Sequence, residues 1–194
     1  ALDSVMNYPL RDALVTFLTG RTTARALADL LLSQRLNYPQ PLYYALMNLT
    51  ASHDVARTRS ALALDFDPRS RTRAELAALE ITDAMAARGA QLQVLAAAVQ
   101  FWLPGIPSIY YGDEAGMQGF EDPLNRGPYP WGQEDSELKS FFSKLAHLRR
   151  EQPALQTGQL HWRWTAGPLL AFARELDGRL LTTVVNAADT PETL

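Results

Sequence analysis

Apolar runs and helical patterns alternate along the first 150 or so residues of the chain. We interpret three short apolar runs, at residues 4–8, 42–49 and 106–111, as strands. The second run, LYYALMNL, is almost continuously apolar, which is typical of a strand buried on both faces of a parallel sheet. A helical pattern follows each run. Because parallel strands need helical crossovers, this order predicts an α/β fold.

The helical patterns predict five helices. The pattern over residues 23–36 places Leu27, Leu30 and Leu31 on one face, and a threonine precedes it as an N-cap. We expect the other four helices at residues 12–18, 72–87, 90–103 and 136–150. Gly89 separates the third helix from the fourth, which a Pro-Gly pair ends.

The pattern changes near Pro153, where short alternating segments joined by glycine and aspartate turns replace the strand–helix order. These segments predict two or three antiparallel strands. We therefore place a domain boundary there, with an α/β part at residues 1–152 and a β part at 153–194. Three strand–helix units neither close a barrel nor cover an open sheet, so we expect the chain to be a piece of a larger α/β protein.

Composition narrows the class of protein. Apolar residues make up 47% and charged residues 20%, which is ordinary for a folded globular chain. A net charge of −3 argues against a nucleic-acid binder, and the lack of cysteine excludes disulfides and cysteine-ligated zinc. No apolar run approaches the ~18 residues that a membrane span needs. The compartment stays open, with the cytoplasm slightly favoured.

Candidate chemistry follows the predicted strands, because parallel α/β folds bind ligands at the carboxyl ends of their strands. His53 and Asp54 come after the second strand, and Arg57 follows as a countercharge for the carboxylate. Such a group suits hydroxyl-rich ligands or proton transfer. An aspartate that caps the next turn beside an exposed histidine remains the alternative.

The third strand leads into a long loop rich in glycine and proline, and loops of this kind are usually functional. Asp113 and Glu114 are either catalytic carboxylates or, as we favour, a supporting group and a cap. Asp122 and Arg126 form either a ligand clamp or a loop ion pair. The spacing of the three histidines does not favour a metal site.

Three segments closely resemble the α-amylase superfamily of glycoside hydrolases: SVMNYPLRDAL, YYALMNLTASHDVARTRSAL and LPGIPSIYYGDEAGMQGFEDPLNRGPYPW. The nearest branch resembles neopullulanases, cyclomaltodextrinases, maltogenic amylases or related α-glucosidases. The resemblance implies a (β/α)8 TIM barrel followed by an all-β domain. Residues 1–152 then hold strands six to eight of the barrel, and residues 153–194 begin an antiparallel β-sandwich.

The resemblance also implies roles for five residues. The family cleaves α-glucosidic bonds with retention, using an aspartate nucleophile after strand four and a glutamate acid/base after strand five. Asp54 matches a third carboxylate that stabilises the transition state, and His53 matches a histidine that binds hydroxyls of the same sugar. Arg57 matches the trailing arginine of that motif. Asp122 and Arg126 match residues that hold a more distant glucose.

Strands four and five are missing from this chain, so we expect residues 1–194 to bind an α-glucan oligosaccharide without cleaving it. We expect no cofactor, with calcium only in the missing upstream part. An added segment at residues 65–88 should lie near the substrate side and shape specificity. Uncovered strand edges should promote self-association. The alternatives are a non-catalytic amylase-like scaffold and a carbohydrate-binding protein.

Overall fold

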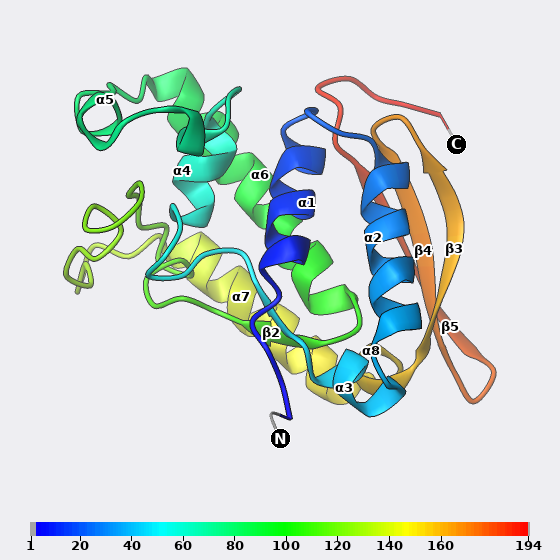
Figure 1. The fold of residues 1–194 in the computed structure, drawn as a ribbon. Helices are drawn as coiled ribbons and strands as arrows, with labels where there is room; N and C mark the ends of the chain where they lie inside the picture. Colours follow the sequence, from blue (N-terminus) through cyan, green and yellow to red (C-terminus); the bar gives the residue numbers. More distant parts are fainter. Residues whose placement is uncertain (1–2, 194) are drawn as a thin grey trace.

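A computed structural model describes residues 3–193 (Figure 1). The elements in the first half are α1 (Tyr8–Leu18), α2 (Ala24–Asn37), α3 (Gln40–Ala45), β1 (Met47–Leu49), α4 (Thr58–Ala63), the 3-10 turn η1 (Pro68–Ser70) and α5 (Arg73–Ala77). Those in the second half are α6 (Asp83–Trp102), β2 (Ile106–Ser108), α7 (Ser136–Glu151), α8 (Pro153–Thr157), β3 (Gln159–Ala166), β4 (Leu169–Leu176) and β5 (Arg179–Asn186). The chain is therefore mixed α/β.

The three predicted parallel strands lie side by side but are much shorter than expected. β1 pairs in parallel with β2, from Met47 opposite Ile106 to Leu49 opposite Ser108. The first predicted strand is reduced to one parallel bridge between Met6 and Met47, because α1 already begins at Tyr8. The prediction of a strand over 42–49 is wrong in its first half, where α3 forms. A short apolar run has no period that separates a buried strand from a buried helix.

The helices at 23–36 and 136–150 are confirmed as α2 and α7, but the predicted helix end at Gly89 is wrong. Instead α6 starts after Thr82 and runs through Gly89 to Trp102, while α5 is a separate short helix. Gly89 marks a close approach between helices: a Cβ added there would lie 2.5 Å from the carbonyl oxygen of Arg59 in α4. This glycine therefore serves packing.

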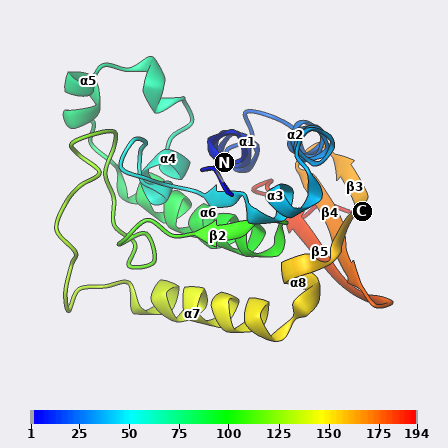
Figure 2. The same ribbon diagram turned by 60° about the horizontal axis from the view of Figure 1, so that its bottom comes forward.

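One apolar core joins the helices to the second sheet. β3, β4 and β5 form an antiparallel sheet in that order, and α2 packs against β3 and β4 (Figures 1 and 2). Leu170, Phe172 and Val185 of this sheet lie in the same buried cluster as Leu14 and Leu27 of α1 and α2. The apolar cluster is thus continuous across residue 153, and the division into two domains stays a prediction.

Two arginines, Arg149 half-buried and Arg174 fully buried, bind the carbonyl groups at the carboxyl end of α6. Arg149 of α7 donates to the carbonyl oxygens of Phe101, Leu103 and Gly105, and Arg174 of β4 donates to that of Trp102 at 2.6 Å. Burial lowers the pKa of each guanidinium to about 10. Cations favour the carbonyl end of a helix, so these contacts fasten α7 and the second sheet to α6.

Several large apolar side chains in and next to the short parallel sheet are exposed. They are Val5 and Met6, Ile106 in β2, and Ile109 and Tyr111 just after β2. None of the helices between residues 3 and 193 is both long enough and apolar enough to cross a membrane. Self-association of the chain stays a prediction.

Candidate functional site

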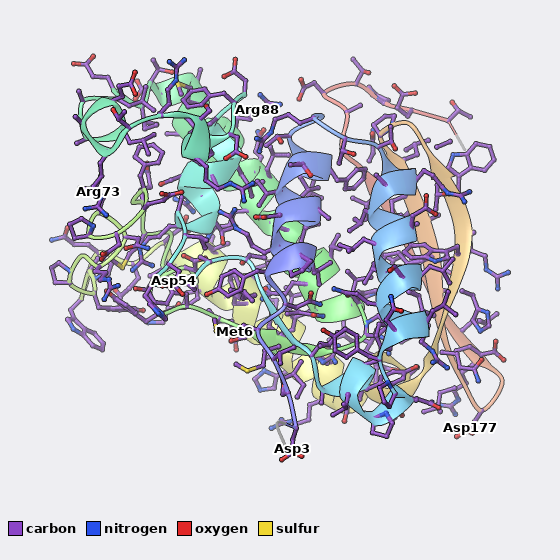
Figure 3. The ribbon with its side chains drawn as sticks, viewed as in Figure 1. Asp3, Met6, Asp54, Arg73, Arg88 and Asp177 are labelled. Atoms are coloured by element: carbon purple, nitrogen blue, oxygen red, sulfur yellow. The ribbon has the colours of Figure 1, made fainter. Side chains whose placement is uncertain are left out.

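His53 and Asp54 stand on a tight turn just beyond β1. Ser52 and Val55 close this turn with an antiparallel bridge, and the Ser52 hydroxyl accepts a hydrogen bond from the Asp54 N–H at 3.0 Å. The side chains of His53 and Asp54 are 53% and 57% exposed, and His53 Nε2 lies 3.1 Å from Asp54 Oδ1. The structure thus brings the predicted pair together in an accessible position, near the loops that follow β2 (Figure 3).

The side chain of Asn125, from the loop after β2, binds the backbone of this turn. Its side-chain amide donates to the carbonyl oxygens of Ser52, His53 and Val55 at 3.0, 3.0 and 2.9 Å. The side chain is fully buried. Sequence reasoning assigned no role to Asn125, although an amide in a Gly- and Pro-rich loop that flanks a candidate site is a usable signal.

Arg57 does not supply the countercharge expected for Asp54. It is fully buried and directs its guanidinium to the loop after β2, where it donates to the carbonyl oxygens of Asn125 at 3.0 Å and Tyr111 at 2.7 Å. It also pairs with Asp113 at 3.3 Å. The guanidinium carbon lies 4.8 Å from the centre of the Tyr111 ring. These contacts make Arg57 a support for two loops, and a role in binding sugar stays a prediction that its burial disfavours.

Asp113 is the buried carboxylate of this support. Thr58 donates to one of its oxygens at 2.5 Å, and Arg57 to the other. Burial raises the pKa of Asp113 to about 6, against the opposing effects of these two partners. The structural interpretation of Asp113 is therefore confirmed. Glu114 beside it is half-buried.

Asp122 and Arg126 form the ion pair that was one of the two expectations for them. Arg126 Nε lies 2.6 Å from Asp122 Oδ1, and both side chains are about half exposed. Asn125 stands next to Arg126 on the same loop. The loop that carries this ion pair therefore also holds, through the Asn125 side chain, the turn that carries Asp54.

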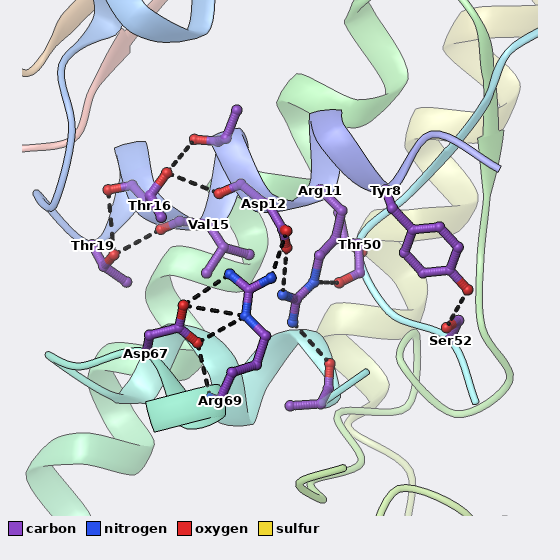
Figure 4. A network of polar contacts seen from close by, with 12 residues as sticks. Tyr8, Arg11, Asp12, Val15, Thr16, Thr19, Thr50, Ser52, Asp67 and Arg69 are labelled. Carbon is purple, nitrogen blue, oxygen red and sulfur yellow. Dashed lines mark hydrogen bonds and ion pairs between the residues drawn. The ribbon is translucent and has the colours of Figure 1, made fainter. Parts of the chain in front are cut away.

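Two further contacts come from α1. The Tyr8 hydroxyl donates to Asp54 Oδ2 at 2.8 Å. Asp12 accepts from Arg69 at 2.8 Å, and Arg69 also pairs with Asp67, as Figure 4 shows. The pair of Arg69 with Asp12 thus ties the added segment, residues 65–88, to α1, and the influence of this segment on specificity stays a prediction.

Within residues 3–193, no group of three or more histidine and acidic side chains is placed to hold a metal ion. The expectation that the chain needs no cofactor stays a prediction.

No protein-family model matches the chain. Among curated proteins, it is 36% identical over 190 residues to an amylopullulanase of Thermoanaerobacter thermohydrosulfuricus, a match that covers 91% of this chain and 12% of the relative. It is 31% identical over 195 residues to a cyclomaltodextrinase of Thermoanaerobacter pseudethanolicus, covering 99% of this chain and 30% of the relative. A neopullulanase 2 of Thermoactinomyces vulgaris is 30% identical over 190 residues, covering 95% and 28%.

Solved structures agree with these relatives. A debranching enzyme of Nostoc punctiforme, soaked with acarbose, matches with a TM-score of 0.76 and 26% identity over 96% of this chain and 37% of that one. A cyclomaltodextrinase matches with a TM-score of 0.75 and 30% identity over 95% and 28%. The chain thus spans between 12% and 30% of the three curated relatives named above. Their agreement in sequence and fold establishes that the chain belongs to the α-amylase family.

Proposed function

We propose that this chain is part of a retaining α-glucan hydrolase and that it carries the sugar-binding side of the active site. The observation that carries the proposal is the half-exposed carboxylate of Asp54, held beside His53 at the carboxyl end of β1. The names of the relatives support the substrate class, since they are an amylopullulanase, a cyclomaltodextrinase and a neopullulanase. We infer cleavage of α-glucosidic bonds in maltodextrin, starch, pullulan or cyclodextrin.

The proposal includes a place in a barrel. The bridge at Met6, then β1, then β2 would be strands six, seven and eight of a (β/α)8 barrel within residues 1–152. Their parallel order supports this assignment. The antiparallel sheet β3–β4–β5 would begin the C-terminal domain over residues 153–194. Asp54 then lies at the end of the barrel where such folds perform chemistry.

In this site Asp54 stabilises the transition state. Glycosidic cleavage builds positive charge on the sugar ring, and a fixed carboxylate nearby stabilises that charge more than it stabilises the ground state. His53 donates to a hydroxyl of the same sugar. Asp122 and Arg126 hold the next glucose toward the non-reducing side. The nucleophile and the acid/base come from strands four and five, so residues 1–194 alone bind glucan without cleaving it.

The test compares the 194-residue chain with the complete protein that carries it. The complete protein should cleave maltodextrin and first release the α-anomer, as NMR of the fresh product would show, while the 194-residue chain releases no sugar. Asp54→Asn should lower kcat at least about 100-fold, the usual effect of losing one electrostatic stabiliser. Asp29→Asn, on the exposed side of α2, is the matched control and should leave the rate unchanged.

Two outcomes contradict the proposal. One is a complete protein that binds maltodextrin but releases no sugar, which is the result expected of a non-catalytic scaffold. The other is full activity in Asp54→Asn. Release of sugar by the 194-residue chain, lost in Asp54→Ala, would overturn the assignment of the nucleophile and acid/base to other strands.

A further inference from the structure

The first turn of α1 contacts the turn that carries Asp54. Tyr8 is the first residue of this helix, and the helix start is well fixed because the Asn7 side chain caps the Leu10 N–H and proline follows Tyr8. The Tyr8 hydroxyl donates to Asp54 Oδ2 at 2.8 Å and lies 3.0 Å from the hydroxyl oxygen of Ser52. The phenol therefore bridges the carboxylate and the start of its turn.

Arg11, one helical turn further on, holds both ends of the same turn. Its guanidinium is buried and donates to the carbonyl oxygens of Thr50 at 3.3 Å and Ala56 at 3.2 Å (Figure 4). Asp12 accepts from its third nitrogen at 3.0 Å. Thr50 and Ala56 flank the turn that carries Asp54, so the planar guanidinium of Arg11 fixes the distance between α1 and that turn.

We propose that Tyr8 is a positioning residue that sets the orientation of the Asp54 carboxylate. This inference rests on the proposed function. Asp54 is more than half exposed, and an exposed aspartate without a partner rotates freely. Tyr8 holds Oδ2 while His53 lies against Oδ1. A carboxylate offers about four acceptor sites, so roughly two remain for sugar.

The surroundings of Tyr8 keep its hydroxyl in the form that donates. The pKa of Tyr8 is raised, and burial is the main cause. The nearby charge of Asp54 raises this pKa further, while Ser52 and Arg11 oppose the shift. The phenol therefore stays protonated at neutral pH and keeps its hydrogen bond to the carboxylate. The orientation of Asp54 is thus set before substrate arrives, which is the condition for an efficient electrostatic stabiliser.

The experiment is Tyr8→Phe in the complete protein, which removes only the hydroxyl. Misplacing a catalytic group costs up to about 100-fold in rate, so we expect kcat on maltodextrin to fall by about 10- to 100-fold with KM nearly unchanged. Tyr38→Phe is the matched control, because Tyr38 lies just beyond α2 and is also partly exposed. It should leave both constants unchanged. Thermal unfolding of both variants verifies that the fold is intact.

A double variant separates positioning from a general structural effect. If Tyr8 acts only through Asp54, adding Tyr8→Phe to Asp54→Asn causes no further loss of kcat. A second readout uses the 194-residue chain with ¹³C-labelled tyrosine. There Asp54→Asn should lower the pKa of Tyr8.

Each result decides a different claim. Wild-type kcat in Tyr8→Phe overturns the inference, and so does an equal loss in the presence and absence of the Asp54 carboxylate. Both results leave the proposed function standing, provided that Asp54→Asn itself is impaired. A complete protein without activity, or an active Asp54→Asn variant, refutes the proposed function and the inference with it.

Discussion

Replacing Asn125 with alanine should destabilise the chain through the turn that carries Asp54. The amide of Asn125 donates to the carbonyl oxygens of Ser52, His53 and Val55 from a fully buried position. An amide has two hydrogens, so it makes two full bonds at most. Each polar group left without a partner costs about 1–3 kcal/mol. Two full bonds are lost, and the part-buried carbonyl oxygen of His53 regains part of that cost from water. The expected loss of stability is therefore about 2–4 kcal/mol.

This loss is a large part of the roughly 5–15 kcal/mol that stabilises an ordinary domain. For a chain of this length it should lower Tm by about 4–16 °C. The assay is urea and thermal unfolding of the 194-residue chain, followed by circular dichroism. Leu124→Ala is the matched control. Leu124 is 38% exposed, so truncation of its side chain should cost less stability. Equal stability of the two variants would refute the claim that the Asn125 amide holds this turn.

Three further predictions concern two supports of the site and the packing of α4 against α6. Arg57→Lys should lower the urea midpoint, because one ammonium cannot replace a fork that reaches Asn125, Tyr111 and Asp113 together; an unchanged midpoint contradicts this. The raised pKa of Asp113 means that the folded chain keeps a proton between about pH 4 and 6 that the unfolded chain releases, so this group's stabilisation is lost as pH rises through that window. The free energy of unfolding of wild type minus that of Asp113→Asn should therefore fall from pH 4.5 to pH 7. A rise of this difference would contradict the prediction. Gly89→Ala should lower Tm despite alanine's better helix propensity, because overpacking costs about 1–3 kcal/mol, and a stabilised variant would show that α4 and α6 can separate freely.

Sustained patterns made part of the fold predictable. The amphipathic stripes of α2 and α7 extend over several turns, and tertiary contacts do not override a signal of that length. The run at 42–49 is too short to fix a period, so its helical first half was missed. Gly89 was taken as a helix end because a sequence does not show how closely another helix approaches.

The candidate site, too, could be predicted from the sequence only in part. His53 and Asp54 are neighbours in sequence, and their position after a strand was enough to predict that they lie together. The contact of Tyr8 with Asp54 spans 46 residues, and those of Asn125 span 70 to 73. Such contacts depend on how α1 and the loop after β2 pack around one turn. Arg57 was assigned to Asp54 for the same reason: spacing alone does not show which way a side chain turns.

The most direct test of the sugar site is an NMR titration of the ¹⁵N-labelled 194-residue chain with maltotriose. We predict shifts concentrated at His53, Asp54, Asp122 and Arg126, and a weakening of these shifts in Asp54→Asn. Shifts that gather on another face, or an Asp54→Asn variant that binds as well as wild type, would contradict it.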